Sequence, residues 1–123
     1  LGVSGIAGDV RTLLASGAPQ AAETLDLFTY RVSQAVASHA VAAGGIDALV
    51  FTAGIGEHAA PVRAAICQRL AWLGLHLDSA ANERQQPCIS QPDSPVSAWI
   101  IPTNEESIIA RDTWRLTTPE QTL

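Results

Sequence analysis

The chain has 123 residues, of which 47% are hydrophobic and 15% are charged, so it can bury enough apolar surface for one folded domain, and disorder is excluded. Its net charge of −5 argues against a nucleic-acid partner, which needs a basic face to neutralise phosphates. No apolar run approaches the roughly 18 residues of a membrane span. All seven cations are Arg, and because a P-loop needs a Lys, a Walker-type kinase is excluded as well.

Two further features of the composition indicate whether the chain is part of a larger protein and which cellular compartment it occupies. The sequence contains no Met, so we expect Leu1 not to be a natural start and the chain to be a piece of a larger protein. Cys67 and Cys88 lack the spacing of a metal site or of a redox pair, which indicates reduced thiols in a cytoplasmic protein.

The first part of the chain is predicted to be helical. A glycine-rich opening over residues 1–8 enters a short helix that begins near Asp9. After Pro19, apolar residues recur every three or four positions, which predicts a long helix over 20–43. His39 lies on this apolar stripe and is expected in the core.

The middle of the chain reads as strand, turn and helix. Residues 46–52 form a short apolar run bounded by glycines, typical of a buried strand in a parallel sheet. A Gly-x-Gly turn over 53–56 follows. The next helix has Pro61 in its first turn and ends at Gly74.

The last part contains one more strand and one more helix. Residues 78–97 are polar and Pro-rich, which predicts a loop with at most a short edge strand near Ile89. Residues 98–101 predict a second buried strand. Thr103 and Glu106 have the spacing of a capping box, so a helix should start there. The three Trp are expected to be packing residues.

The order of these elements predicts an α/β fold with a parallel sheet. Two strands are too few for a stable sheet, so we expect an incomplete sheet with flanking helices, and further strands upstream.

The strand that ends at Thr52 leads into the most informative segment. Ligands of open α/β sheets bind beyond the carboxyl ends of the strands, and Gly54 and Gly56 would let a ligand approach the backbone. The free N–H groups of the following helix would attract an anion. The alternative is a tight turn with nothing bound. A dinucleotide fingerprint is disfavoured because Ala59 stands where a third Gly is needed.

Two other segments carry side chains suited to a nucleotide or a metal. Glu105 could reach a hydrated Mg²⁺, although acids in a first helical turn often only complement the helix dipole. Asp9 could accept from a ribose hydroxyl and Arg11 could pair with a phosphate, but a helix cap and a surface cation are the alternative interpretation. No Ser-His-Asp or Cys-His arrangement is recognisable.

Taken in order, three segments resemble the C-terminal portion of the acetate kinase (acetokinase) family of short-chain acyl kinases. Gly2 to Arg11 resembles G-[IV]-S-G-x-S-x-D-[FM]-R, and Asp47 to His58 resembles D-x-L-V-F-T-[GA]-G-I-G-E-N. Pro102 to Glu106 reads P-T-N-E-E, as in the family.

The resemblance implies an actin/hexokinase-like (ribonuclease H-like) ATPase fold, with ATP in the cleft between two lobes. Residues 1–123 would be the C-terminal portion of the nucleotide-binding lobe, and the upstream lobe would be absent from this chain. The complete enzyme would convert ATP and acetate reversibly to ADP and acetyl phosphate with Mg²⁺, and would be a homodimer. The family's acyl pocket and catalytic groups lie upstream, so the resemblance implies no catalytic residue here and does not distinguish acetate from propionate or butyrate.

The resemblance also implies roles for individual residues. Asp9, Val10 and Arg11 would line the adenosine end of the nucleotide site, Glu105 would belong to the Mg²⁺ site, and the nucleotide-binding turn would consist of Gly54, Ile55, Gly56, Glu57 and His58. Val10 replaces an aromatic residue or Met of the family, and His58 replaces an Asn. The alternative function is a non-catalytic nucleotide-binding or dimerisation remnant of such a kinase.

Overall fold

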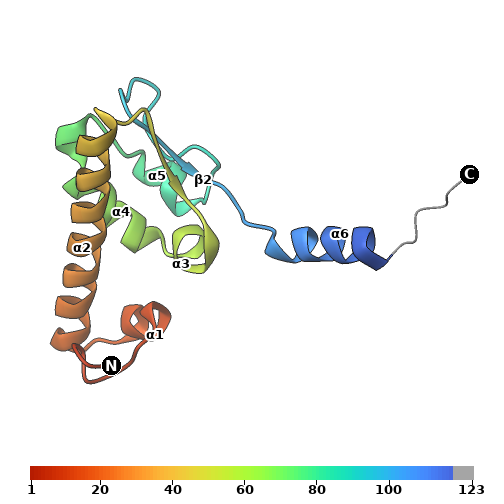
Figure 1. Cartoon of the computed structure of the whole chain (residues 1–123). Helices are drawn as coiled ribbons and strands as arrows, with labels where there is room; N and C mark the ends of the chain where they lie inside the picture. The colour runs from red at the N-terminus through yellow and green to blue at the C-terminus, as the bar shows by residue number, and fades with distance from the viewer. Residues whose placement is uncertain (118–123) are drawn as a thin grey trace, which may run out of the picture.

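A computed structural model describes residues 1–117, apart from the side chain of Glu105. Its elements, labelled in Figure 1 where there is room, are α1 (Val10–Ala15), α2 (Pro19–Ala43), β1 (Ala48–Phe51), α3 (Ala53–His58), α4 (Ala60–Arg69), a short 3₁₀ helix η1 (Ala71–Leu73), α5 (Ser79–Glu83), β2 (Ser97–Ile100) and α6 (Glu105–Thr117). In the part of the chain so described, no helix is both long and apolar enough to cross a membrane.

The two strands form a small parallel sheet, as predicted. β1 pairs with β2 from Ala48 opposite Ser97 to Phe51 opposite Ile100. The segment around Ile89 runs along the far edge of β2, where the N–H of Ile89 donates to the carbonyl of Ala98 at 2.9 Å. The pairing with β2 is a single isolated bridge, Cys88 opposite Trp99, rather than a strand, because the Pro-rich segment supplies only a few ladder bonds.

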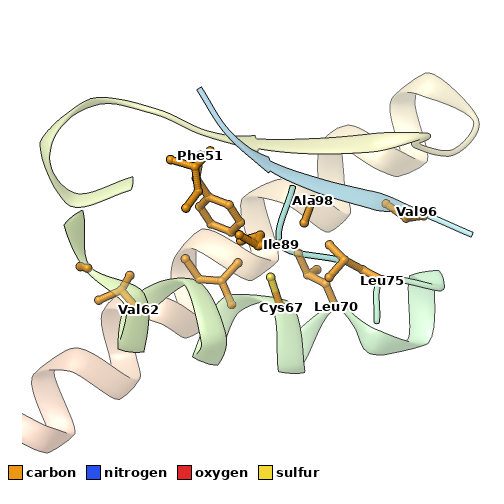
Figure 2. Close-up of a cluster of buried hydrophobic side chains, with 11 residues drawn as sticks. Phe51, Val62, Cys67, Leu70, Leu75, Ile89, Val96 and Ala98 are labelled. Atoms are coloured by element: carbon orange, nitrogen blue, oxygen red, sulfur yellow. The ribbon is translucent and has the colours of Figure 1, made fainter. Parts of the chain in front are cut away.

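The core lies between one face of this sheet and α4 (Figure 2). Phe51, Ala98 and Ile100 point from the strands toward Val62 and other apolar side chains of α4. The opposite face of the sheet carries Val50 and Trp99, which are exposed. Only one face of the sheet is therefore covered within the described chain, and this is the incomplete sheet that the sequence predicts.

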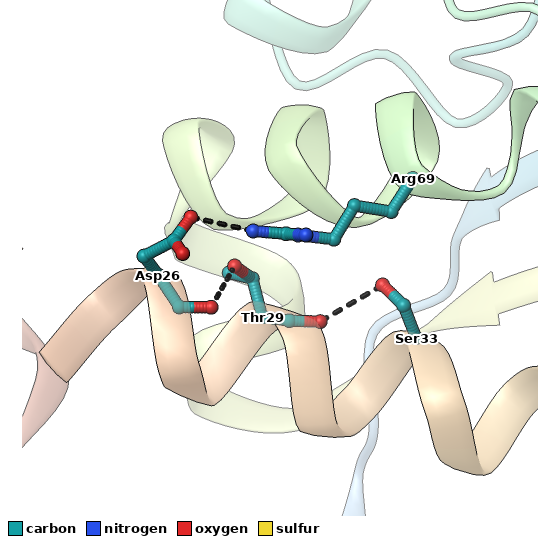
Figure 3. Close-up of polar contacts among 4 residues, drawn as sticks. All are labelled: Asp26, Thr29, Ser33 and Arg69. Carbon is teal, nitrogen blue, oxygen red and sulfur yellow. Dashed lines mark hydrogen bonds and ion pairs between the residues drawn. The ribbon is translucent and has the colours of Figure 1, made fainter. Parts of the chain in front are cut away.

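Helix α2 packs beside α4, and small polar side chains lie buried between them along with the partly buried Phe28, Val32 and Val36 (Figure 3). Thr29 and Ser33 are buried, and each hydroxyl donates to a carbonyl one turn earlier, so neither costs an unpaired polar group. The Arg69 guanidinium of α4 pairs with Asp26 of α2 and lies over the ring of Tyr30, 5.5 Å from its centroid.

Two expectations about single side chains are wrong. His39 is exposed, because the buried stripe of α2 passes through its neighbour Ala40 instead. Trp72, Trp99 and Trp114 are all exposed, because nothing else in the described chain covers the surfaces that carry them.

Other predicted elements also change. The helix expected to end at Gly74 ends at Arg69, and η1 follows it up to Leu73. The turn after β1 is the short helix α3, and the loop 78–97 contains α5, whose N-terminus is capped by Asp78. The capping box of Thr103 and Glu106 does not form. Asn104 caps α6 instead, accepting from the N–H of Ser107 at 3.0 Å, and the Thr103 N–H that Glu106 would accept in a capping box donates to Glu57.

Candidate functional site

A cavity of about 850 Å³ brings together the two glycine-rich segments singled out in the sequence. One wall is the opening loop with α1, and another is the start of α3. The residues that line it are Leu1, Gly2, Val3, Ala7, Gly8, Asp9, Val10, Arg11, Leu13, Leu14, Thr24, Leu25, Phe28, Gly54, Ile55, His58 and Ala59. Six of the nine predicted site residues therefore share this cavity.

The wall formed by the opening loop is held in shape by Ser4. The buried Ser4 hydroxyl accepts from the N–H groups of Ile6 and Ala7 at 3.1 and 3.2 Å, and donates to the Ala7 carbonyl at 2.8 Å. The sequence analysis did not single out Ser4. Its place in a glycine-rich loop, where Ser side chains often bond to nearby backbone, is the signal that was available.

Asp9 has a structural task as well as a place at the cavity. Its Oδ1 accepts from the N–H of Thr12 at 2.8 Å and caps α1. Hydrogen bonds from Thr12 hold the pKa of Asp9 below its ordinary value. The neighbouring Val10 is half-buried against the core, whereas Arg11 is exposed at the cavity.

The two glycines of the turn after β1 face different surroundings. A Cβ built on Gly54 meets nothing within 4 Å, so this position borders open space at the cavity. A Cβ on Gly56 would lie 3.2 Å from the carbonyl carbon of Phe51, so Gly56 permits close packing against β1 and does not line the cavity. Ala53, just before them, has a φ of 59°, a conformation that favours Gly.

Glu57 does not line the cavity either. Its Oε1 accepts from the N–H of Thr103 at 2.9 Å and from the Thr103 hydroxyl at 3.2 Å. The backbone hydrogen bond from Thr103 is the main cause that lowers the pKa of Glu57 below its ordinary value. Glu57 therefore connects α3 to the segment that precedes α6.

A buried cation on α4 holds the end of α3 in place. Arg63 of α4 donates to the carbonyls of Gly56 and Glu57 at 2.9 and 2.8 Å, and its Nε donates to Oδ1 of Asn82 in α5 at 2.7 Å. Burial of the guanidinium lowers the pKa of Arg63. The hydrogen bonds offset the free-energy cost of burying this charge. Sequence reasoning missed this role of Arg63 and Asn82, since neither stands in a motif that marks a buried pair.

Helix α2 supplies a third wall that the sequence analysis also missed. Thr24, Leu25 and Phe28 line the cavity opposite α1. The apolar stripe of the long helix could have suggested Leu25 and Phe28, but periodicity does not distinguish a cavity wall from a core contact.

The predicted metal residue is placed only through its backbone. Glu105 is the first residue of α6, and its side chain lies outside what the structure describes. Figure 1 shows α6 extending away from the rest of the fold. Among the described residues, no three or more His, Cys, Asp or Glu side chains stand together as a metal site would require.

Comparisons with known proteins agree on one family. Residues 1–111 match the model of the Acetokinase family. The acetate kinase of Rhodopseudomonas palustris (strain TIE-1) is 57% identical over 94% of this chain, and the propionate kinase of Citrobacter rodentium (strain ICC168) is 46% identical over 98%. The crystal structure of the Porphyromonas gingivalis acetate kinase covers 96% of this chain with a TM-score of 0.82 at 35% identity.

The chain spans about 30% of the length of these curated relatives and 31% of that solved chain. Together with the small open parallel sheet and its flanking helices, the match confirms the expected fold class, part of an actin/hexokinase-like lobe. The family model matches nearly the whole chain, and we conclude that this chain belongs to the acetokinase family.

Proposed function

We propose that this chain forms one wall of the nucleotide site of an enzyme that transfers a phosphoryl group reversibly between ATP and the carboxyl group of acetate. The observation that carries the proposal is the shared cavity. Asp9, Val10 and Arg11 meet Gly54, Ile55 and His58 there, although the two segments are far apart in the sequence. Residues 1–123 would be the C-terminal portion of the nucleotide-binding lobe.

The lining suits the different parts of a nucleotide. Val10, Leu25 and Phe28 offer apolar surface on which a base would lie, while Asp9 would accept from a ribose hydroxyl. Arg11 and His58 are the side chains at the cavity that can donate to phosphate oxygens. The open space at Gly54 leaves room for a phosphate to approach the backbone.

Magnesium would be shared between this chain and the nucleotide. Mg²⁺ usually keeps several waters and is bound by one or two carboxylates together with substrate phosphates, so a single residue of this chain is a sufficient contribution. Glu105 is the residue we assign to it, because Thr103, two residues earlier, is bonded to Glu57 of α3, the helix that also carries Gly54 and His58. The ion would neutralise charge on the phosphates.

The remaining parts of the reaction would belong to the rest of the complete protein. Phosphoryl transfer depends on positioning and charge stabilisation, and we assign no catalytic residue to this chain, so residues 1–123 alone should be inactive. Relatives named for acetate and for propionate both match, and we place the acyl pocket outside this chain. We further propose that the complete enzyme is cytoplasmic and a homodimer.

A chimera tests the proposal. This chain would replace the corresponding 30% of the Rhodopseudomonas palustris acetate kinase, with which it shares 57% identity. We expect Mg²⁺-dependent formation of acetyl phosphate from ATP and acetate, trapped as the hydroxamate. A folded chimera without turnover would support the non-catalytic alternative instead.

A single substitution in the chimera tests the turn. Gly54→Val should raise the KM for ATP by about tenfold, which corresponds to about 1.4 kcal/mol, because the valine side chain would occupy space that we assign to the nucleotide. The matched control is Gly17→Val, since Gly17 also has open space around it but does not line the cavity. Equal KM values for the two folded variants would contradict the assignment.

A further inference from the structure

The side chain of Glu57 bonds to Thr103 and does not line the neighbouring cavity. It belongs to the same short helix as Gly54, Ile55 and His58, yet it does not line their cavity. Both of its described hydrogen bonds go to Thr103, one from the backbone N–H and one from the hydroxyl. Thr103 lies 46 residues further along the chain, so this is a tertiary contact.

The backbone at Glu57 is held as firmly as its side chain. Arg63, which is fully buried, donates to the carbonyl of Glu57 at 2.8 Å and is itself tied to Asn82 of α5. The bond from Arg63 fixes the backbone from which the side chain extends. The carboxylate bonds to Thr103, whereas Gly54 and His58 of the same helix line the cavity.

The contact bears on the metal segment because of where Thr103 stands. It is two residues before Glu105, between β2 and α6, and among the described side chains only that of Glu57 bonds to it. A carboxylate that accepts two hydrogen bonds holds its donors more strongly than a neutral acceptor would. Without this bond, little else in the described chain would define where residues 103–105 lie relative to α3.

We propose that Glu57 is a positioning residue, which fixes the segment before Glu105 beside the nucleotide cavity and makes no contact with the nucleotide. The proposal rests on the proposed function in one respect, namely that Glu105 serves the metal. It differs from the role that the family resemblance implied for Glu57, which is a direct part in binding the nucleotide.

The first test measures the contact itself, in the full 123-residue chain. Hydrogen exchange of the Thr103 amide, followed by NMR, should accelerate on the order of fivefold in Glu57→Ala, because one hydrogen bond is lost. Glu57→Gln keeps an Oε1 acceptor and should restore most of the protection. Thr103→Val removes only the hydroxyl donor and should leave its own amide largely protected. Unchanged exchange in Glu57→Ala would show that the contact does not form.

The second test separates positioning from nucleotide contact. Titration calorimetry would use ATP without metal and ATP with excess MgCl₂, on variants whose folding is checked by circular dichroism. Glu57→Ala should leave the Kd for metal-free ATP within about twofold and weaken binding of MgATP on the order of fivefold, with Glu57→Gln close to the unaltered chain. An equal loss for both ligands would make Glu57 a nucleotide contact, and no loss for either would exclude the positioning role.

The outcomes distinguish this proposal from the proposed function. If neither the chain nor the chimera binds ATP, or if Gly54→Val binds it equally well, the proposed function is wrong and Glu57 has no site to position, while the Thr103 exchange rates still report whether the contact exists. If Gly54→Val weakens binding but Glu57→Ala affects neither ligand, only the role of Glu57 is overturned.

Discussion

Helices α4 and α6 both carry isoleucine and arginine side chains but have opposite surroundings. Ile66 of α4 is 3% exposed beneath the sheet, whereas Ile109 of α6 is 66% exposed, and every described side chain of α6 is exposed. Figure 1 shows α6 extending away from the rest of the fold. The difference shows that an amphipathic pattern indicates a helix face that can be buried. Whether that face is buried depends on the presence of another element that covers it. Three experiments use matched pairs from these two helices.

The largest difference is expected from truncating the two isoleucines. Ile66→Ala removes a fully packed side chain and leaves a cavity, which should lower the free energy of unfolding by about 4 kcal/mol. Ile109→Ala should change it by less than about 0.5 kcal/mol. Urea denaturation of the 123-residue chain measures both. A large loss in Ile109→Ala would mean that α6 is covered in solution.

Two arginines give the next largest difference. Arg63→Met leaves the carbonyls of Gly56 and Glu57 and the side chain of Asn82 without their donor, at a cost of about 3 kcal/mol. Arg111→Met on α6 removes only an exposed contact with Asp112 and should cost less than about 0.5 kcal/mol. If thermal denaturation gives the same loss for both variants, the buried network of Arg63 contributes nothing specific.

The third pair compares a cysteine on each helix and is expected to change stability least. Its readout is the rate at which each thiol is alkylated. Burial raises the pKa of Cys67 on α4 to about 12, so the reactive thiolate is scarce at pH 8 and stays scarce at pH 9. In a Cys88→Ser background, Cys67 should therefore react slowly with iodoacetamide. Thr113→Cys on α6 should react quickly and faster as the pH rises. Rapid alkylation of Cys67 in the native chain would indicate that α4 opens away from the sheet.

Local sequence signals predicted most of the fold, because they act within a few residues. Asp9 caps α1 as its position suggested, and Pro19 begins the long helix that ends at Ala43. The two apolar runs form β1 and β2 in parallel, as the intervening helix required. The motif order also led to the right family, because the glycine-rich and P-T-N-E-E segments keep their spacing.

Only the tertiary structure decided which candidate residues line the cavity and which make structural contacts. Gly54 and Gly56 are equivalent in the sequence, but one borders open space and the other packs on Phe51, because β1 passes behind only one of them. The spacing of Thr103 and Glu106 predicted a capping box, but the Thr103 N–H that Glu106 would accept donates to Glu57, and Asn104 caps α6. Such choices depend on which distant groups arrive within hydrogen-bond distance, and residue spacing along the chain contains no information about that.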